Sequence, residues 1–330
     1  MTGPEAEATV ADAAPVSPRS GPSWRSHALF WGKMILSVGL LAAVIWKVRP
    51  TLPSLDRINW GTIAIATALL AAHPPLIAWR WRLILRAFGR RSSYFPLVQS
   101  TWVSVLAGQF LPASVGGDVV RVLLMRGDGA GLGLLASSVV VDRAVALVGI
   151  AVLAIMFCPL LLTSADASMM WLTAGIAGLG LLGVPVLALL TGPIETAASR
   201  FRWIRPVAVL FGYIRIFLAR PALALGALGI ALLIHALSAA ALVVISAGLG
   251  ISMEPLHLVG ISVIITFAMA LPISIAGWGV REAVAVTLLG AFQVPGDTAL
   301  LAALLLGMAY ALASLPGGII WLVRARKTDT

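Results

Sequence analysis

The sequence predicts an all-α polytopic membrane protein, arranged as an inverted-topology repeat of transmembrane helices with two re-entrant helical hairpins. Three observations predict this fold. The 330 residues are 60% hydrophobic and 11% charged, with a mean hydropathy of +1.01, whereas soluble domains carry about 25% charged residues. One short phrase containing Pro, Gly and Arg interrupts a long apolar run in each half of the chain. Arginine clusters separate the apolar runs, and such clusters set the orientation of membrane helices.

The interrupting phrase follows the pattern L-P-x-S-[VI]-x-G-x-x-V-R. Its copies are Leu111-Pro112-Ala113-Ser114-Val115-Gly116-Gly117-Asp118-Val119-Val120-Arg121 and Leu271-Pro272-Ile273-Ser274-Ile275-Ala276-Gly277-Trp278-Gly279-Val280-Arg281. Proline removes a backbone donor and glycine weakens a helix, so each apolar run should break there. In lipid, freed backbone groups are tolerated only where protein or a water-filled cavity covers them. Paired interrupted segments are typical of a transporter's binding site.

Composition divides the chain into one membrane domain with two tails. Residues 1–28 are rich in Ala, Pro, Ser and Glu and predict a disordered cytoplasmic tail rather than a cleavable signal. Residues 29–323 form a single transmembrane domain, with repeat one at about 58–162 and repeat two at about 221–323. The basic end of the chain, 324–330, predicts a second cytoplasmic tail.

Six full spans are expected in this domain. They lie near residues 30–46, 58–79, 134–162, 170–191, 221–248 and 298–323. His73-Pro74-Pro75 should kink the second span, because Pro cannot continue the helical hydrogen bonds. Residues 192–220 mix arginines with Phe, Trp, Ile and Leu, which is typical of a helix lying in the cytoplasmic interface.

Two topologies are open for the motif segments, 94–126 and 256–293. Each flank of a break is shorter than the roughly 20 residues that a full span needs. Re-entrant hairpins keep the basic clusters at 80–91, 121–126, 192–220 and 324–327 cytoplasmic and leave Lys47, Arg49 and Arg57 outside. Single broken crossings put the arginines of 192–220 outside, against the positive-inside rule. We therefore prefer hairpins, the first entering from the cytoplasm and the second from outside.

Both breaks predict an anion site. A new half-helix should begin near Asp118 and near Val280, and a helix N-terminus has unpaired N–H groups and a partial positive charge. Each also carries an arginine, Arg121 or Arg281. Two helix ends and two guanidinium forks predict a seat for a lipid phosphate near the membrane midplane. Alternatively, Arg121 snorkels to the interface, and Arg281 pairs with an acid only to hold its hairpin.

Several acidic and polar residues complete the candidate site. Asp118 and Glu282 could offset the arginines, or receive a cationic headgroup or a proton. Asp142 and Arg143 lie inside a span and, as helix neighbours, point in different directions, so at least one should face the bundle interior. The full set of candidate lipid-binding residues is Ser114, Gly117, Asp118, Arg121, Asp142, Arg143, Ser274, Gly277, Arg281 and Glu282.

Other functional classes find little support. The net charge of +10 does not indicate nucleic acid, because most Lys and Arg flank apolar runs. Cys158 is the single cysteine, so neither a disulfide nor a cysteine metal cluster is expected. The GxGxxG string at 178–183 lies in an apolar run, where it indicates helix packing rather than a nucleotide site. We expect no cofactor, no metal and no enzymatic activity, and structural roles for His73, His235 and Tyr310.

At these motifs the chain resembles the transmembrane flippase-like family of the lysylphosphatidylglycerol synthases. The residues that carry the resemblance are Gly108 through Arg121, Val141-Asp142-Arg143, and Leu271-Pro272 through Gly277-Trp278-Gly279-Val280-Arg281-Glu282. It covers about residues 30–323. The resemblance implies movement of aminoacylated phospholipids between leaflets, or a stand-alone role in glycolipid or hopanoid pathways. No aminoacyl-transfer domain is apparent, so synthesis of lysyl-lipid is not implied.

The functional prediction is a flippase-like lipid transporter of the bacterial inner membrane, with both termini cytoplasmic. Its substrate would be a phospholipid or a glycolipid or isoprenoid-linked lipid with an anionic or zwitterionic headgroup. The alternative is a non-transporting accessory or scaffold protein that assists a lipid-modifying enzyme. A membrane-embedded transferase is a third possibility, disfavoured because no activating group is visible in the loops.

Overall fold

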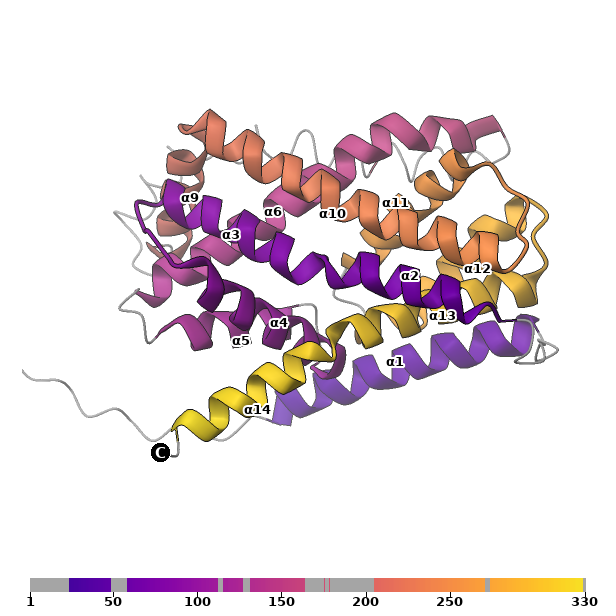
Figure 1. Cartoon of the computed structure of the whole chain (residues 1–330), viewed down its shortest axis with the longest axis horizontal. Coiled ribbons are helices and arrows are strands. Elements are labelled where there is room, and N and C mark those ends of the chain that lie inside the picture. The colour runs from indigo at the N-terminus through magenta and orange to yellow at the C-terminus, as the bar shows by residue number, and fades with distance from the viewer. Residues whose placement is uncertain are drawn as a thin grey trace, which may run out of the picture.

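The computed structural model describes residues 24–48, 58–111, 115–126, 131–163, 175, 178, 205–270 and 274–328. Every regular element within these residues is a helix (Figure 1). The helices are α1 (Trp24–Val48), α2 (Trp60–Ala71), α3 (His73–Ala87), α4 (Tyr94–Phe110), α5 (Val115–Met125), α6 (Leu132–Phe157), η3 (Cys158–Thr163), α9 (Arg205–Leu218), α10 (Pro221–Gly248), α11 (Pro255–Ala270), α12 (Val280–Ala291), α13 (Gly296–Ser314) and α14 (Pro316–Thr328).

Four long apolar helices make this a polytopic membrane protein, as the sequence predicts. They are Trp60–Ala87, Leu132–Phe157, Pro221–Gly248 and Gly296–Arg324, of 26 to 29 residues each. At about 1.5 Å per residue, each exceeds the roughly 30 Å of a bilayer's apolar core. The first of these is kinked as expected, because α2 ends at Ala71 and α3 begins at His73, with prolines in its first turn.

The other expected spans agree with the helices of the structure only in part. The span near 30–46 coincides with α1, whose apolar stretch, Met34–Val48, is shorter than a full crossing. Only residues 175 and 178 of the span at 170–191 are described. Residues 192–204 of the expected interfacial helix lie outside the described residues, and the remainder of that helix contains α9. Helix α1 begins inside the segment 1–28, and α14 continues into the segment 324–330.

Each copy of the motif separates two short helices. Helix α4 ends at Phe110 and α5 begins at Val115, while α11 ends at Ala270 and α12 begins at Val280. Within each pair the two helices pack against one another. Residues 112–114 and 271–273 lie outside the described part of the chain, and the candidate site residue Ser114 is among them.

The long helices alternate in direction. In Figure 1 the chain runs from right to left along α2–α3 and along α13–α14, and from left to right along α6 and α10. Helix α3 therefore ends at the left end, where α6 begins, and α10 ends at the right end, where α13 begins. The α4–α5 pair thus joins two helices at one end of the bundle, and the α11–α12 pair joins two helices at the other.

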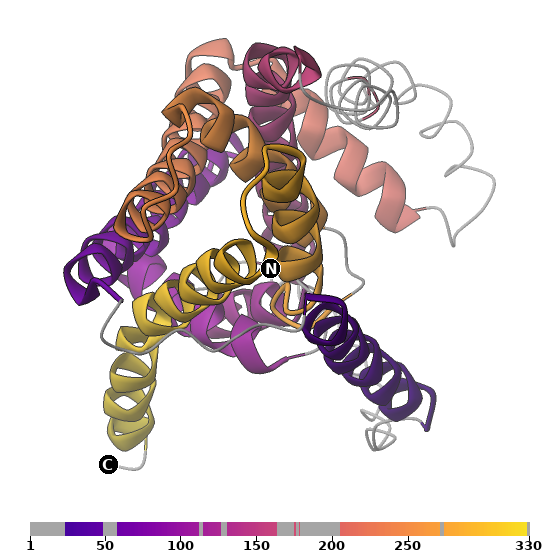
Figure 2. The ribbon, with the colours of Figure 1, turned by 90° about the vertical axis from the view of Figure 1, so that its right-hand side faces the viewer.

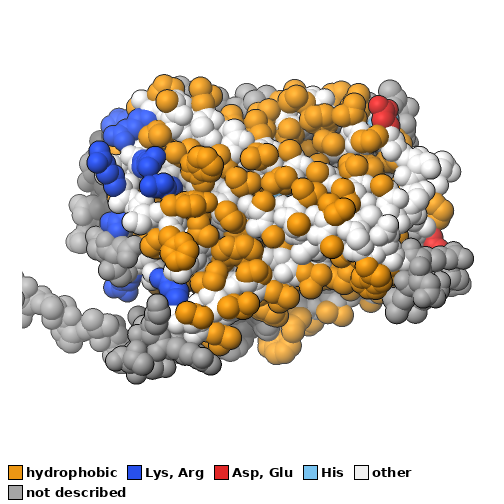
Figure 3. Space-filling model, in the orientation of Figure 1, with side chains coloured by type: hydrophobic (Ala, Val, Ile, Leu, Met, Phe, Trp, Pro, Cys, Tyr) orange, Lys and Arg blue, Asp and Glu red, His pale blue; other side chains and the backbone are white. Residues whose placement is uncertain are grey.

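Hydrophobic and basic side chains occupy different parts of the surface along the length of the bundle. Figure 3 shows hydrophobic side chains over the middle of the molecule, with Lys and Arg gathered at the left end. Figure 2 shows α1 and the end of α14 projecting from the bundle, and both expose large apolar side chains such as Trp31, Ile35, Trp321 and Leu322. Exposed apolar surface of this kind matches a lipid environment.

Candidate functional site

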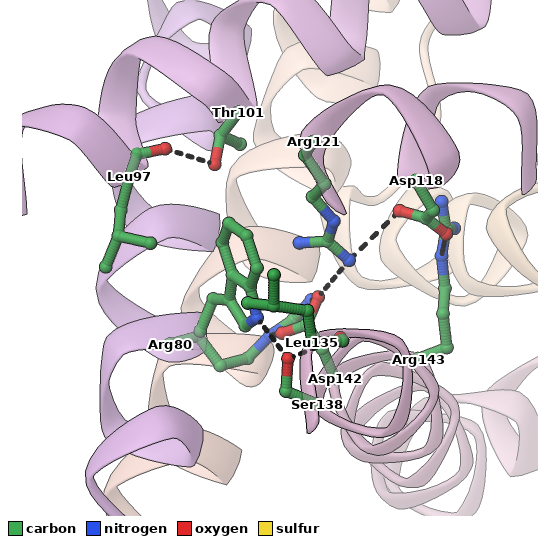
Figure 4. A network of polar contacts seen from close by, with 10 residues as sticks. Arg80, Leu97, Thr101, Asp118, Arg121, Leu135, Ser138, Asp142 and Arg143 are labelled. Carbon is green, nitrogen blue, oxygen red and sulfur yellow. Dashed lines mark hydrogen bonds and ion pairs between the residues drawn. The ribbon is translucent and has the colours of Figure 1, made fainter. Parts of the chain in front are cut away.

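Five charged side chains alternate in sign from the bundle interior to its surface (Figure 4). In order they are Arg80, Asp142, Arg121, Asp118 and Arg143. They come from α3, α5 and α6, so three helices assemble this charge chain. Because each carboxylate lies between two guanidinium groups, each interior charge has oppositely charged neighbours, which buried charges require.

Asp142 accepts hydrogen bonds from two arginines of this charge chain. Its Oδ1 accepts from Arg80 Nε at 2.7 Å and its Oδ2 from Arg80 Nη2 at 3.1 Å, a two-point contact. The same Oδ2 accepts from Arg121 Nη2 at 3.0 Å. Asp142 is 1% exposed and Arg80 4%. A fork-to-carboxylate pair at this depth fixes both orientation and helix spacing.

Asp118 links the buried part of this charge chain to its exposed end, Arg143. Its Oδ1 lies 3.0 Å from Arg121 Nη2, and its Oδ2 accepts from Arg143 Nε at 2.7 Å. Asp118 is buried, but the side chain of Arg143 is 50% exposed. Asp142 and Arg143, although adjacent, therefore take different partners, as their positions on a helix predict.

A cavity of about 250 Å³ opens beside these charges. Its lining residues are Ile77, Arg80, Thr101, Ser104, Val105, Gly108, Gln109, Gly117, Asp118, Arg121, Asp142, Arg143, Ala146, Met269, Ser274, Ala276, Gly277 and Tyr310. Both copies of the motif contribute to this lining. Three arginines and two aspartates line it, which leaves one net positive charge to face a ligand.

Arg121 lines this cavity and has side-chain donors without a partner. Its side chain is 2% exposed, and only Nη2 bonds to carboxylates. Its Nε and Nη1 are buried without a hydrogen-bond partner. Buried polar groups are nearly always paired, and an orphaned guanidinium donor carries a desolvation penalty. An anion in the cavity would supply the missing acceptor.

Trp81 supports the guanidinium of Arg121. The Arg121 Cζ lies 4.9 Å from the centre of the Trp81 ring, a cation–π distance. The indole Nε1 donates to Ser138 Oγ at 2.8 Å, and that hydroxyl donates to Leu135 O at 2.7 Å. Trp81 is fully buried. A rigid ring with its polar edge bonded therefore fixes the guanidinium's position.

Gly117 brings α5 into contact with α4. A Cβ at Gly117 would overlap the backbone carbonyl oxygen of Ser104. Only glycine lets the two backbones approach this closely, and the approach places Asp118 and Arg121 beside the cavity.

Gly117→Ala is therefore expected to lower the free energy of unfolding by about 1–3 kcal/mol, the range for overpacking a tight contact. The measurement is the thermal unfolding midpoint in detergent. Gly290→Ala is the matched control, because a Cβ there has nothing within 4 Å. Equal midpoints for the two variants would contradict a tight α4–α5 contact.

The second break is held by α1. Ser37 of α1 accepts a hydrogen bond from the Ile275 backbone N at 2.9 Å. Gly277 has φ +79° and Gly279 has φ +83°, backbone angles that favour glycine. A Cβ at Gly279 would lie 2.6 Å from the Ser37 carbonyl oxygen. Helix α1 thus closes on the break, a contact that the sequence alone does not indicate.

Arg281 and Glu282 form a separate pair. Arg281 Nε donates to Glu282 Oε1 at 2.9 Å, and Glu282 Oε2 accepts from the Gly279 backbone N at 2.6 Å. Arg281 also stacks on Trp278, 4.5 Å from the ring centre. The two charged residues are 1% and 0% exposed. The pair caps the start of α12 and stabilises the turn before it.

The structure describes nine of the ten predicted residues, all but Ser114, and brings seven of these nine together. Gly117, Asp118, Arg121, Asp142, Arg143, Ser274 and Gly277 all line the cavity. Arg281 and Glu282 are not among the lining residues, so of the two arginines in the repeated motif only Arg121 lies at this cavity. Helix α12 begins at Val280 as expected, and α5 begins at Val115, three residues before Asp118.

Arg80 is the important residue that sequence reasoning places elsewhere. The charge pattern groups it with the basic residues that flank the second span, yet it is buried against Asp142. The signal lies in the helical spacing. Arg80 and Trp81 lie four and three residues before Ile84, so the three share one face of α3, and all three are buried. A cation within an apolar stripe indicates an interior partner.

Two histidines and a tyrosine near the cavity contact neighbouring protein groups. His235 Nε2 is 3.0 Å from Ala146 O. The Tyr310 hydroxyl donates to Ser238 Oγ at 3.0 Å, and the His73 ring packs edge-on to Tyr310. Among the described residues, no group of three or more His, Cys, Asp or Glu is placed to hold a metal ion.

The sequence of this protein is similar to one protein family and, over part of its length, to one membrane protein. A family model described as the lysylphosphatidylglycerol synthase TM region matches residues 34–317. A UPF0104 membrane protein of Archaeoglobus fulgidus is 29% identical over 106 residues, which are 31% of this chain and 32% of that protein. The alignment spans about a third of that relative. No solved structure matches the chain.

The family match covers both breaks, all five members of the alternating charge chain, and every residue that lines the cavity. It extends over far more than half of the 330 residues. The resemblance noted from the two motifs is thereby confirmed, and the chain belongs to the family defined by the transmembrane region of the lysylphosphatidylglycerol synthases.

Proposed function

We propose that this protein moves a lipid between leaflets, and that the lipid's phosphate binds in the cavity beside Arg121. One observation carries the proposal. Arg121 has two buried donors without a partner, and it lines a cavity whose charged side chains, among the described residues, sum to one positive charge. Because both motifs line this cavity, it lies where the two halves of the chain meet. The protein is a transporter rather than an enzyme in this proposal.

A phosphate suits these donors for geometric reasons. Guanidinium groups bind phosphate oxygens through paired N–H donors, and such charge-assisted bonds are about twice as strong as neutral ones. The first turn of α5 adds unpaired N–H groups and a partial positive charge. Asp118 and Asp142 hold the arginines in place and limit the net charge. An anionic headgroup neutralises the site, and a zwitterionic headgroup could place its cation beside an aspartate.

The repeat supports a path across the membrane. Each half consists of a long helix, a short broken pair and a second long helix, and the helices of the two halves run in opposite senses (Figure 1). We propose that α4–α5 and α11–α12 are re-entrant hairpins, entered from opposite sides, and that the two halves form an inverted repeat. The basic end then faces the cytoplasm by the positive-inside rule, with both termini on that side.

Cysteine labelling tests this topology. In a background with Cys158 replaced by serine, Pro295→Cys should react with an impermeant thiol reagent added outside intact cells. Ser93→Cys, at the opposite end of the bundle, should react only after the membrane is opened. Both positions are exposed. External labelling of Ser93→Cys would contradict the proposed orientation, and labelling of both positions from one side would contradict the hairpins.

Reconstitution tests transport itself. Purified protein in liposomes should accelerate the exchange of fluorescent phosphatidylglycerol between leaflets, read by adding an impermeant quencher outside. Empty liposomes provide the background rate.

An accessory role is also compatible with the family match: the protein would assist a lipid-modifying enzyme without moving lipid. A rate equal to that of empty liposomes, across anionic and zwitterionic lipids, would favour this accessory role.

A further inference from the structure

We propose a second anion site, a phosphate-binding basin at the basic end of the bundle. The basin has a volume of about 630 Å³ and is lined by Arg82, Arg86, Gly89, Arg91, Ser92, Arg220 and Leu223. It shares no lining residue with the deep cavity. Its ligand would be a phosphate group, carried either by an anionic lipid of the adjacent leaflet or by a soluble phosphate ester. The site is independent of the proposed transport function.

The charge of the basin is unbalanced. Among the described residues, four arginines line it and no acidic side chain does. Arg82 and Arg86 lie four residues apart on α3, a spacing at which like charges on a helix repel. The deep cavity differs, because its arginines alternate with aspartates. An anion is the missing partner in the basin.

Two of the four arginines are held by backbone carbonyls. Arg82 Nε donates to Ser92 O at 3.1 Å, and Arg220 Nη1 donates to Arg86 O at 2.8 Å. These bonds tie the loop after α3 and the start of α10 to the end of α3. The rim of the basin is therefore preorganised, which lowers the entropy cost of binding.

Arg86 and Arg91 supply the available charge. Both are exposed, and neither guanidinium has a hydrogen-bond or ion-pair partner in the described structure. Ser92, which lines the same basin, is 9% exposed, and its hydroxyl is buried without a hydrogen-bond partner. The Ser92 hydroxyl and the guanidinium groups of Arg86 and Arg91 are donors suited to phosphate oxygens.

Gly89 shapes the loop that carries these groups. Its φ of +84° is a left-handed value that favours glycine. Gly89 N donates to Arg86 O and Arg90 N to Leu85 O, at 3.0 and 2.9 Å, which ends α3 in a tight C-terminal turn. Arg91 and Ser92 follow this turn and line the basin together with Arg86.

The test uses the full chain and two probes. Phosphatidylglycerol, added in neutral detergent, is followed by native mass spectrometry, and inorganic phosphate is followed by thermal shift. The test variant is Arg86→Gln with Arg91→Gln. The matched control is Lys47→Gln with Arg126→Gln, which removes the same charge from exposed positions outside the basin.

Losing two charge-assisted bonds should weaken binding of one probe about 100-fold, since each is worth about tenfold, while the control variant keeps wild-type affinity. Loss of one phosphatidylglycerol-binding step alone assigns the lipid, and loss of the phosphate shift alone assigns a soluble ester. Binding in the deep cavity is retained in either case. If test and control variants bind both probes equally, the basin is not a phosphate site.

A second variant guards against misfolding. Arg86→Lys with Arg91→Lys keeps the charge but loses the planar fork. It should bind the same probe about tenfold more weakly than wild type, one bond's worth of affinity. Wild-type affinity in this variant would overturn forked recognition in the basin.

Discussion

Arg121→Ala is expected to reduce lipid movement about 10- to 100-fold while the protein still folds. A charge-assisted hydrogen bond is worth about 1.5–3 kcal/mol, and about 1.4 kcal/mol is a factor of ten. Folding should survive because each carboxylate keeps one arginine, Asp142 with Arg80 and Asp118 with Arg143. The cavity would then hold two arginines and two aspartates and would have lost its surplus positive charge.

The measurement is the exchange rate of fluorescent phosphatidylglycerol in proteoliposomes, with a monodisperse size profile as the folding check. Arg126→Ala is the control, an exposed arginine that does not line the cavity. Arg121→Lys should recover part of the rate, because an ammonium keeps the charge without the fork. A wild-type rate in folded Arg121→Ala would contradict the phosphate seat and make the accessory role the better proposal.

Glu282→Gln is expected to destabilise the fold by about 3–5 kcal/mol, the cost of leaving one member of a buried ion pair uncompensated. Glu282 serves Arg281 with one oxygen and the Gly279 backbone N with the other. An amide has a single acceptor oxygen, so one of these two donors loses its partner. The thermal unfolding midpoint in detergent measures the loss.

A double variant separates the buried charge from the rest of the effect. Arg281→Met combined with Glu282→Gln removes the unpaired cation, and the new amide oxygen can still accept from Gly279. We expect the double variant to be more stable than Glu282→Gln alone, a coupling typical of residues in direct contact. If the two losses simply add, Arg281 and Glu282 do not act as a pair.

Arg121 and Arg281 have different roles, although the motif makes them look equivalent. Both follow a glycine-containing break near the start of a half-helix. Arg121 has acidic partners on two helices, lines the cavity and has two donors without a partner, whereas Arg281 contacts its sequence neighbour Glu282 and Trp278. The alternative considered for Arg281, pairing with an acid in a structural role, fits its contacts with Glu282 and Trp278.

Local chemistry allows much of the fold to be predicted. Hydropathy locates the four long helices, because each must be apolar over the thickness of a bilayer. The kink at His73-Pro74-Pro75 and the start of α12 at Val280 follow from proline and glycine, whose backbone effects need no tertiary context. Asp142 is expected to turn inward because a charge in a span needs an interior partner.

Partnerships between helices need the tertiary structure. Arg80 and Asp142 lie far apart in the chain, and only the packing of α3 on α6 makes them neighbours. The contact of Ser37 with the second break likewise depends on where α1 docks.

Sequence by itself therefore determined which segments are helical and apolar, where they break, and which charges lie within them. Tertiary structure alone decided which of those charges share a cavity and which are consumed by a local pair. The physical reason is rotation. A helical residue turns about 100° from its neighbour, so a small change in how a helix docks determines whether its arginine faces a cavity, a carboxylate or lipid.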